Sequence, residues 1–130
     1  MTAVSLELPL RQSDLDSLGH VNQAVYHELL EEVRTAFFRE ALPDLPASGF
    51  VLARVEADYK REVRIDHRYL IGEARAVDIG RSRLELENRL LLPDGEVALE
   101  GKVVLVAWDG EARKSRPWSD EERAALMNHG

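Results

Sequence analysis

A carboxylate, a glycine, a histidine and an asparagine lie close together just before the clearest helical pattern in the sequence. These residues are Asp16, Gly19, His20 and Asn22. The first N–H groups of a helix have no partner within the helix, and they lie at the positive end of its dipole. A carboxylate beside such donors could attack a carbonyl or activate water, while the donors stabilise the resulting oxyanion. The segment therefore favours chemistry on a carbonyl group.

The helix that would position these groups is predicted over residues 24–42, which contain neither Gly nor Pro. Its apolar residues recur at the spacing of one helical face, and charged residues occupy most of the other positions. Asn22 is a suitable N-cap, and Pro43 with Pro46 would end the helix. A second, short helix is predicted after Ser119, which begins a capping-box pattern.

Alternation of apolar and polar residues predicts several strands around this helix. The stretches with this pattern are residues 4–10, 51–60, 70–79, 84–92 and 97–105. Pro9 indicates that the first of them is an edge strand or has an irregular end, because proline cannot donate to a strand ladder. One long helix packed on an antiparallel sheet is an α+β fold.

The register of one hairpin follows from the turn signal Asp94-Gly95. A two-residue turn would pair Pro93 with Glu96. Counting outward gives the facing pairs Leu90 with Leu99, Leu86 with Val103, Arg89 with Glu100, and Glu87 with Lys102. Apolar residues then meet on one face and opposite charges on the other, whereas a slip of one residue would mix them.

The motif Asp-x-Asp-x-x-Gly-His-Val-Asn-x-x-x-Tyr at residues 14–26, followed by Glu-x-x-Arg at residues 31–34, resembles the hotdog-fold acyl-CoA thioesterases of the 4-hydroxybenzoyl-CoA thioesterase type. The resemblance continues at residues 55–63 and 77–82. It implies a single domain over residues 1–130. In that domain one long central helix is wrapped by an antiparallel sheet of about five strands, and a short C-terminal helix follows.

The resemblance implies hydrolysis of an acyl-CoA thioester to a free acid and CoA. Asp16 matches the position that carries the nucleophile or general base, whereas Asp14 is expected to be structural. Gln23 matches the position whose backbone N–H points at the thioester oxygen, and Asn22 would help to shape the carbonyl site. His20 would contact the thioester, orient Asp16, or lie as a polar residue near a subunit interface.

The other expected contacts with the substrate are Gly19, Val21, Tyr26, Arg81, Arg83, Arg61 and Arg64. The chain has a formal net charge of −7, so a local basic cluster must attract the CoA phosphates. Arg81 and Arg83 follow the Gly80 turn and are the first choice, with Arg61 and Arg64 next. Leu, Val and Ala dominate the presumed pocket faces, which favours an aliphatic acyl group.

Composition excludes several other classes of protein. A chain of 130 residues with 45% hydrophobic and 32% charged residues is typical of one globular domain. Cysteine is absent, which excludes a disulfide framework and a thiol nucleophile. The negative net charge disfavours general nucleic-acid binding. We expect a cytoplasmic protein, because residues 1–4 lack a signal-peptide pattern and no apolar run is long enough to span a membrane.

No metal or cofactor is expected. The segment His27-Glu28-Leu29-Leu30-Glu31 lacks the second histidine of the zinc-protease motif. We do expect a homodimer or homotetramer, because the sheet edge near residues 99–105 and one helix flank would otherwise stay uncovered. The main alternative to the enzyme is a non-catalytic hotdog protein that binds acyl groups or dimerises. A hotdog hydratase is a further alternative, but the spacing from Asp16 to His20 does not match that family.

Overall fold

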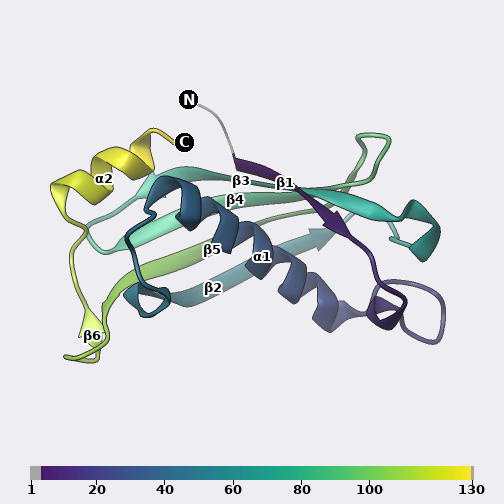
Figure 1. Cartoon of the computed structure of the whole chain (residues 1–130), viewed down its shortest axis with the longest axis horizontal. Coiled ribbons are helices and arrows are strands. Elements are labelled where there is room, and N and C mark those ends of the chain that lie inside the picture. The colour runs from purple at the N-terminus through teal and green to yellow at the C-terminus, as the bar shows by residue number, and fades with distance from the viewer. Residues whose placement is uncertain (1–3, 130) are drawn as a thin grey trace.

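An antiparallel sheet curls around one long helix in the computed structural model, which describes residues 4–129 (Figure 1). The elements are β1 (Val4–Pro9), α1 (Gln23–Ala41), β2 (Phe50–Tyr59), β3 (Tyr69–Ile79), β4 (Arg83–Leu91), β5 (Val97–Asp109), β6 (Lys114–Ser115) and α2 (Asp120–Met127). The strand order is β1-β3-β4-β5-β2, and β6 pairs with the end of β5. The predicted α+β class, long helix and short C-terminal helix are confirmed. Residues 1–3, on which part of the signal-peptide argument rests, lie outside the described residues.

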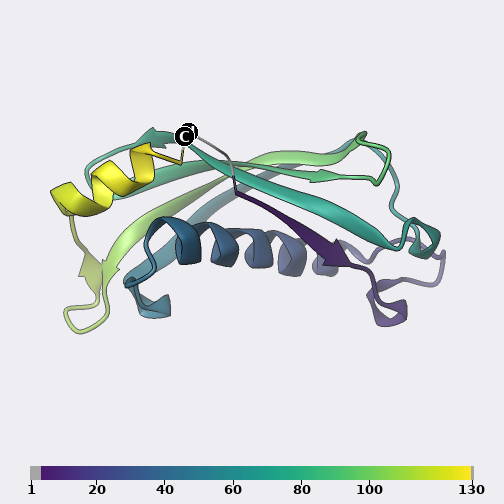
Figure 2. The ribbon, with the colours of Figure 1, turned by 45° about the horizontal axis from the view of Figure 1, so that its top comes forward.

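The helix α1 lies in the concave face of the sheet (Figure 2). Val33 and Phe37, one turn apart on the apolar face of α1, are fully buried. Gly72 of β3 allows the helix to approach closely, because a side chain at this position would overlap Val33 and Leu8. The apolar face of the helix and the apolar faces of the strands thus pack into one core. Burial of its apolar face stabilises the helix.

The β4–β5 hairpin has the predicted register over most of its length, with all four predicted facing pairs present. The turn itself differs from the prediction. Leu92 N–H donates to Glu96 O at 2.8 Å, so residues 93–95 form the loop. Proline has no N–H, and Pro93 therefore cannot close the tighter turn in both directions. One extra residue in β5, Ala98, restores the register beyond the turn.

The two edge strands are β1 and β2. Of the two alternatives that Pro9 allowed for β1, an edge strand or an irregular end, the structure shows the edge strand, but the prediction of an open edge at residues 99–105 is wrong. The strand β5 pairs with β4 on one side and with β2 on the other. Alternation along a strand identifies its buried face but not its neighbours, which long-range pairing decides. The open edge belongs to β2, where Leu52 and Tyr59 are 45% and 47% exposed.

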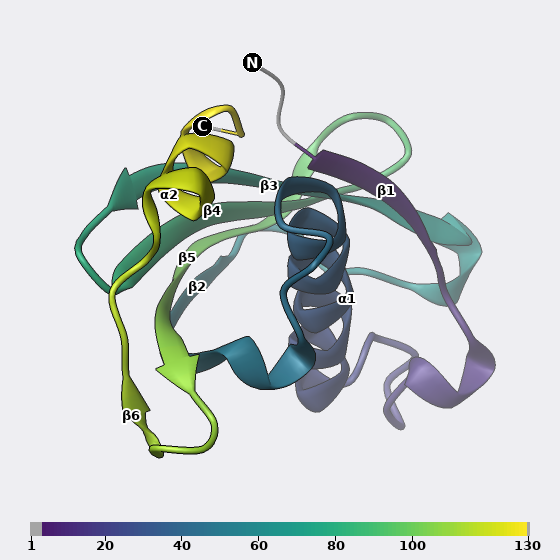
Figure 3. The same cartoon turned by 60° about the vertical axis from the view of Figure 1, so that its left-hand side comes forward.

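The C-terminal segment packs near the C-terminal end of α1 (Figure 3). Leu126 of α2 is fully buried, and the indole Nε1–H of Trp118 donates to the carbonyl of Arg83 at 3.2 Å. Ser119 caps α2 and completes the predicted capping box with Glu122. These contacts attach the C-terminal segment to the turn between β3 and β4.

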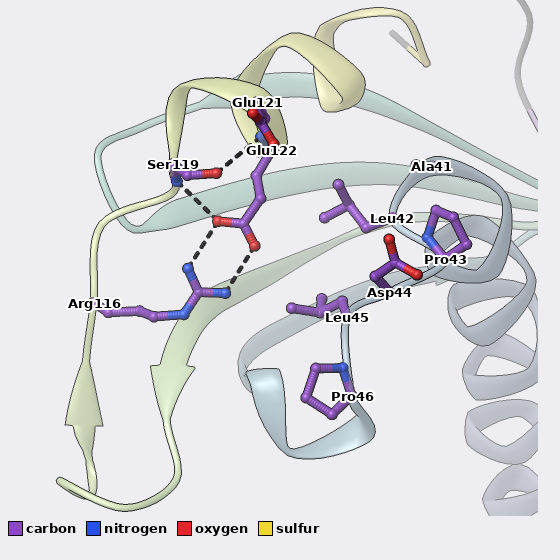
Figure 4. Close-up of a pocket in the computed structure, with 10 residues that line it drawn as sticks. All are labelled: Ala41, Leu42, Pro43, Asp44, Leu45, Pro46, Arg116, Ser119, Glu121 and Glu122. Carbon is purple, nitrogen blue, oxygen red and sulfur yellow. Dashed lines mark hydrogen bonds and ion pairs between the residues drawn. The ribbon is translucent and has the colours of Figure 1, made fainter.

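Arg116 and Glu122 form a two-fold hydrogen-bonded ion pair beside a cavity of about 490 Å³ between α2 and residues 41–46 (Figure 4). The Nη1–Oε1 and Nη2–Oε2 distances are 2.8 and 2.9 Å. The hydrogen bond from Arg116, followed by that from the Ser119 N–H, lowers the pKa of Glu122 to about 2. The pair therefore couples the fold of the C-terminal segment to pH.

We predict that Glu122→Gln lowers the free energy of unfolding at pH 7 and has a much smaller effect near pH 2. The pKa of Glu122 in the fold is depressed below the ~4.3 of an unfolded chain, so the ionised pair stabilises the fold above that value. The stabilisation is lost as pH falls from there through about 2. Thermal melts of the wild type and of Glu122→Gln, at a series of pH values from 7 down to 2, measure this loss of stabilisation. Glu121→Gln is the control and should leave the melting temperature nearly unchanged. A difference between wild type and Glu122→Gln that is as large at pH 2 as at pH 7 would contradict the assignment.

Candidate active site

A cavity of about 480 Å³ opens where the loop before α1 meets the end of β2. The residues that line it are Asp16, His20, Val21, Gln23, Tyr26, Tyr59, Lys60, Arg61 and Glu62. Six of them were expected from the sequence as catalytic or substrate-binding residues, and the fold brings these six together. The other three, Tyr59, Lys60 and Glu62, were not.

The loop of residues 16–20 orients the carboxylate of Asp16. Its Oδ1 accepts hydrogen bonds from Leu18 N–H at 2.8 Å and from His20 N–H at 3.2 Å. The backbone closes the same loop, with Asp16 N–H donating to His20 O at 2.8 Å. Gly19 has a φ of 79°, a conformation that glycine adopts without strain. Within residues 4–129, Oδ2 of Asp16 accepts no hydrogen bond, so one oxygen is held and the other is available.

Asp14 is structural, as expected. Asp14 is 1% exposed, and its carboxylate accepts hydrogen bonds from the backbone N–H and from Nη2 of Arg11, each at 2.8 Å. The Asp14 carbonyl accepts a hydrogen bond from Asn22 N–H at 2.7 Å. Asp14 therefore braces the entry to the helix and does not line the cavity.

Asn22 caps α1, since its side chain accepts a hydrogen bond from Ala24 N–H at 2.9 Å. Gln23 is the first residue of α1 and lines the cavity. Within the described part of the chain, no group accepts a hydrogen bond from Gln23 N–H. The positive end of the helix dipole thus lies beside Asp16, with a backbone donor unpaired.

His20 is tied to the segment that leaves β2. Its Nε2 lies 2.8 Å from Oε2 of Glu62, and its backbone forms an isolated antiparallel bridge with Arg64. The next residue continues this pairing, with Val21 N–H donating to Val63 O at 2.9 Å. Sequence reasoning missed Glu62 because the pairing joins segments more than 40 residues apart. Periodicity within either segment contains no signal for it.

Two tyrosines form an aromatic wall of the cavity. The rings of Tyr26 and Tyr59 meet edge to face, with their centroids 5.1 Å apart. Burial raises the pKa of Tyr26, and the neighbouring Tyr59 and Asp16 raise it further. The expectation of an apolar pocket made of Leu, Val and Ala therefore does not describe this part of the cavity.

The basic residues expected to bind substrate lie in two separate places. Arg61 lines the cavity and forms an ion pair with Glu96 at 2.5 Å. Arg64 lies beside His20 and is held by Asp66 at 3.1 Å. Arg81 and Arg83 lie at the opposite end of the sheet, next to the C-terminal segment (Figure 1). A single copy of the chain does not bring them to Asp16.

Neither a metal cluster nor a membrane-spanning helix occurs in the described residues. Within residues 4–129, no three His, Cys, Asp or Glu side chains gather closely enough to hold a metal ion. None of the helices in this part of the chain is long and apolar enough to cross a membrane. The cavity near Glu122 has a paired Arg116 and no residue expected to react with a carbonyl.

Several known proteins are similar to this chain in sequence and fold. Residues 10–126 match the model of the thioesterase-like superfamily. A thioesterase from Thermus thermophilus, complexed with coenzyme A and zinc, is 34% identical, with a TM-score of 0.86 over 95% of this chain and 91% of that one. The PA2801 protein of Pseudomonas aeruginosa is also 34% identical, with a TM-score of 0.83 over 94% and 96% of the two chains. YsmA of Bacillus subtilis is 28% identical over 94% of this chain and 84% of its own length. The chain has the hotdog fold and belongs to the thioesterase-like superfamily.

Proposed function

We propose that the chain hydrolyses an acyl-CoA thioester to a free acid and CoA, with Asp16 as the reacting carboxylate. The observation that carries the proposal is the geometry of this carboxylate at the start of α1. Two backbone N–H groups hold Oδ1, while Oδ2 has no partner within residues 4–129 and Asp16 lines the cavity. The 34% identity to a thioesterase complexed with coenzyme A supports the choice of substrate.

Asp16 can start the reaction in two ways. As a nucleophile, Oδ2 bonds to the thioester carbon, the C–S bond breaks to release the CoA thiolate, and water then hydrolyses the mixed anhydride to the acid and the Asp16 carboxylate. As a general base, the carboxylate takes a proton from a water whose oxygen bonds to the same carbon, the C–S bond then breaks, and the CoA thiolate takes up that proton. In both routes negative charge develops on the carbonyl oxygen. The N–H of Gln23 at the helix N-terminus is the proposed donor to that oxygen.

We predict that Asp16→Asn lowers kcat on an accepted acyl-CoA by at least about a hundred-fold and leaves the fold intact, because an amide neither attacks the carbonyl nor takes a proton. The hydrogen bonds to Oδ1 can persist, since an asparagine oxygen accepts them as well. Release of CoA is measured with a thiol-reactive dye, and folding is measured by thermal melting.

Asp109→Asn is the matched control for this variant. Asp109 Oδ1 also accepts two backbone N–H bonds, from Glu111 and Ala112, each at 3.0 Å, but Asp109 does not line the cavity. Its kcat should stay close to that of the wild type. Near-normal turnover by folded Asp16→Asn would eliminate Asp16 as the reacting group. Binding of acyl-CoA without turnover by the wild type would instead favour the non-catalytic acyl-binding module.

Arg61 and Lys60 are the proposed contacts of the CoA phosphates. They line the cavity that contains Asp16, whereas Arg81 and Arg83 lie at the other end of the sheet within one copy. Arginine is suited to this role because its guanidinium matches the geometry of a phosphate. Arg61 would have to exchange Glu96 for a phosphate oxygen when CoA binds.

We predict that Lys60→Glu with Arg61→Glu raises KM for acyl-CoA by about ten-fold at low ionic strength, which corresponds to ~1.4 kcal/mol. The increase should be smaller at high salt, because salt screens charges at an exposed rim. kcat should change little, since the phosphates lie far from the reacting carbon and contact both states equally. The same reversal at Arg81 and Arg83 is the comparison. An effect of that pair alone would move the phosphate site to the other end of the sheet.

The open edge of β2 is the proposed contact with a second copy of the chain. A groove of about 290 Å³ runs between α1 and β2, and Leu52, Val55 and Arg34 line it. Arg34 is 8% exposed, and its nearest carboxylate oxygen, on Glu31, is 3.9 Å away. Burial lowers the pKa of Arg34 and the nearby Glu31 carboxylate raises it, so an oxygen acceptor from a second copy would favour the charged guanidinium. A second copy paired along β2 would cover the edge and the groove, giving a homodimer as the unit of any homotetramer.

We predict that the wild type is a stable dimer or tetramer at micromolar concentration and that Leu52→Lys shifts it toward monomer. The substitution adds a charge beside Arg34 in a groove that the second copy would cover. Sedimentation velocity measures the shift. Met127→Lys is the control, because Met127 is a 61% exposed apolar residue on α2, away from this groove. A wild type that sediments as a monomer would contradict the assembly.

A further inference from the structure

We propose that Glu62 is a positioning residue, which sets the direction of the imidazole of His20, the residue whose backbone is hydrogen-bonded to Asp16. The inference rests on the proposed hydrolysis and assigns a role to a residue that the sequence did not single out. Glu62 and His20 both line the cavity of Asp16, and Oε2 of Glu62 lies 2.8 Å from Nε2 of His20.

His20 is the link between the two carboxylates. Its backbone N–H donates to Oδ1 of Asp16 and its backbone carbonyl accepts from Asp16 N–H, at 3.2 and 2.8 Å. Its side chain reaches in the other direction, to Glu62. A change in the position of the imidazole therefore acts on a residue that supplies two of the hydrogen bonds around Asp16.

The backbone places the two side chains together without help from the ion pair. The bridge between His20 and Arg64 and the bond from Val21 N–H to Val63 O fix the two segments side by side. Glu62 therefore does not hold the loop to the sheet. What it adds is the direction of the imidazole, because Oε2 of Glu62 lies 2.8 Å from Nε2, which carries a proton in the charged ring and in one neutral tautomer.

The charged groups around Glu62 are compatible with this role. Nη1 of Arg64 lies 3.4 Å from Oε1 of Glu62, so the two oxygens of Glu62 have different partners. Arg64 is itself held by Asp66 at 3.1 Å. Oε1 of Glu62 is therefore occupied by Arg64, and Oε2 lies beside Nε2 of His20. His20 and Glu62 are 40% and 51% exposed, so this pair contributes little to global stability.

The test compares Glu62→Ala with Glu62→Gln in the full-length protein. Glu62→Ala should lower kcat on an accepted acyl-CoA by about ten-fold, the range expected for one lost polar contact at a partly exposed site. KM should stay within about two-fold, because the loss concerns the reacting atoms and not uniform binding. Glu62→Gln should restore most of kcat, since its amide oxygen can make the same close contact with Nε2 of His20. The double variant with His20→Ala should be no slower than His20→Ala alone, as expected for two residues that act through one contact.

A spectroscopic measurement tests the contact independently of turnover. The ring C–H resonances of His20 are assigned among the four histidines by their loss in His20→Asn. They should shift in Glu62→Ala and remain near their wild-type positions in Glu62→Gln. Glu87→Ala is the control for both measurements, because Glu87 forms a similar ion pair, with Arg75 at 3.1 Å, on the sheet away from the cavity.

Two results would overturn the inference. An unchanged kcat in Glu62→Ala, while Asp16→Asn abolishes turnover, would show that Glu62 does not position the site and would leave the proposed function standing. A loss in Glu62→Ala as large as that in Asp16→Asn, without rescue by glutamine, would make Glu62 a reacting group instead. If Glu62→Ala shifts the His20 resonances but the wild type hydrolyses no acyl-CoA, the contact stands and the proposed hydrolysis is refuted.

Discussion

The burial of α1 in the curved sheet is the constraint on which the rest of the structure depends. The helix has an apolar face that includes Val33 and Phe37, and both are fully buried. Gly72 receives Val33 closely, while the loop before the helix reaches the end of β2. Once the helix lies in the concave face of the sheet, its N-terminus is fixed at one end of the sheet. The dipole and the unpaired N–H groups of the helix are then available at that end.

Backbone pairing between two short segments forms the candidate active site. Residues 20 and 21 pair with residues 63 and 64, so the loop before α1 lies against the segment that leaves β2. This pairing brings Asp16 and His20 close to Tyr59, Arg61 and Glu62, none of which is near them in the sequence. The hydrogen bonds to Oδ1 of Asp16 come from the backbone, and they orient the carboxylate without burying it.

The two ends of the molecule differ in whether their polar groups are paired. At the end opposite the cavity, the pair between Arg116 and Glu122 and the indole hydrogen bond of Trp118 hold the C-terminal segment in place. These groups are satisfied by one another, as stabilising polar groups usually are. At the Asp16 end, an oxygen of a carboxylate and the first N–H of α1 have no partner within residues 4–129. Unpaired polar groups in a cavity are what a substrate can bind.

The sequence by itself determined the elements and the residues that are candidates for the chemistry, because both depend on local spacing. Helical periodicity identified α1, the Asn22 cap followed from residue type, and charge and apolar pairing identified the register between β4 and β5. The motif around Asp16 and His20 was recognisable because its residues are neighbours in the chain.

Tertiary structure decided what depends on which segments pair. It made β2 and not β5 the open edge, moved the hairpin turn to residues 93–95, and separated Arg81 and Arg83 from the cavity within one copy. It also brought Glu62 to His20 and Tyr59 to Tyr26. The physical reason is that periodicity reports which face of an element is buried, whereas the partner of that face is chosen by the packing of the whole chain.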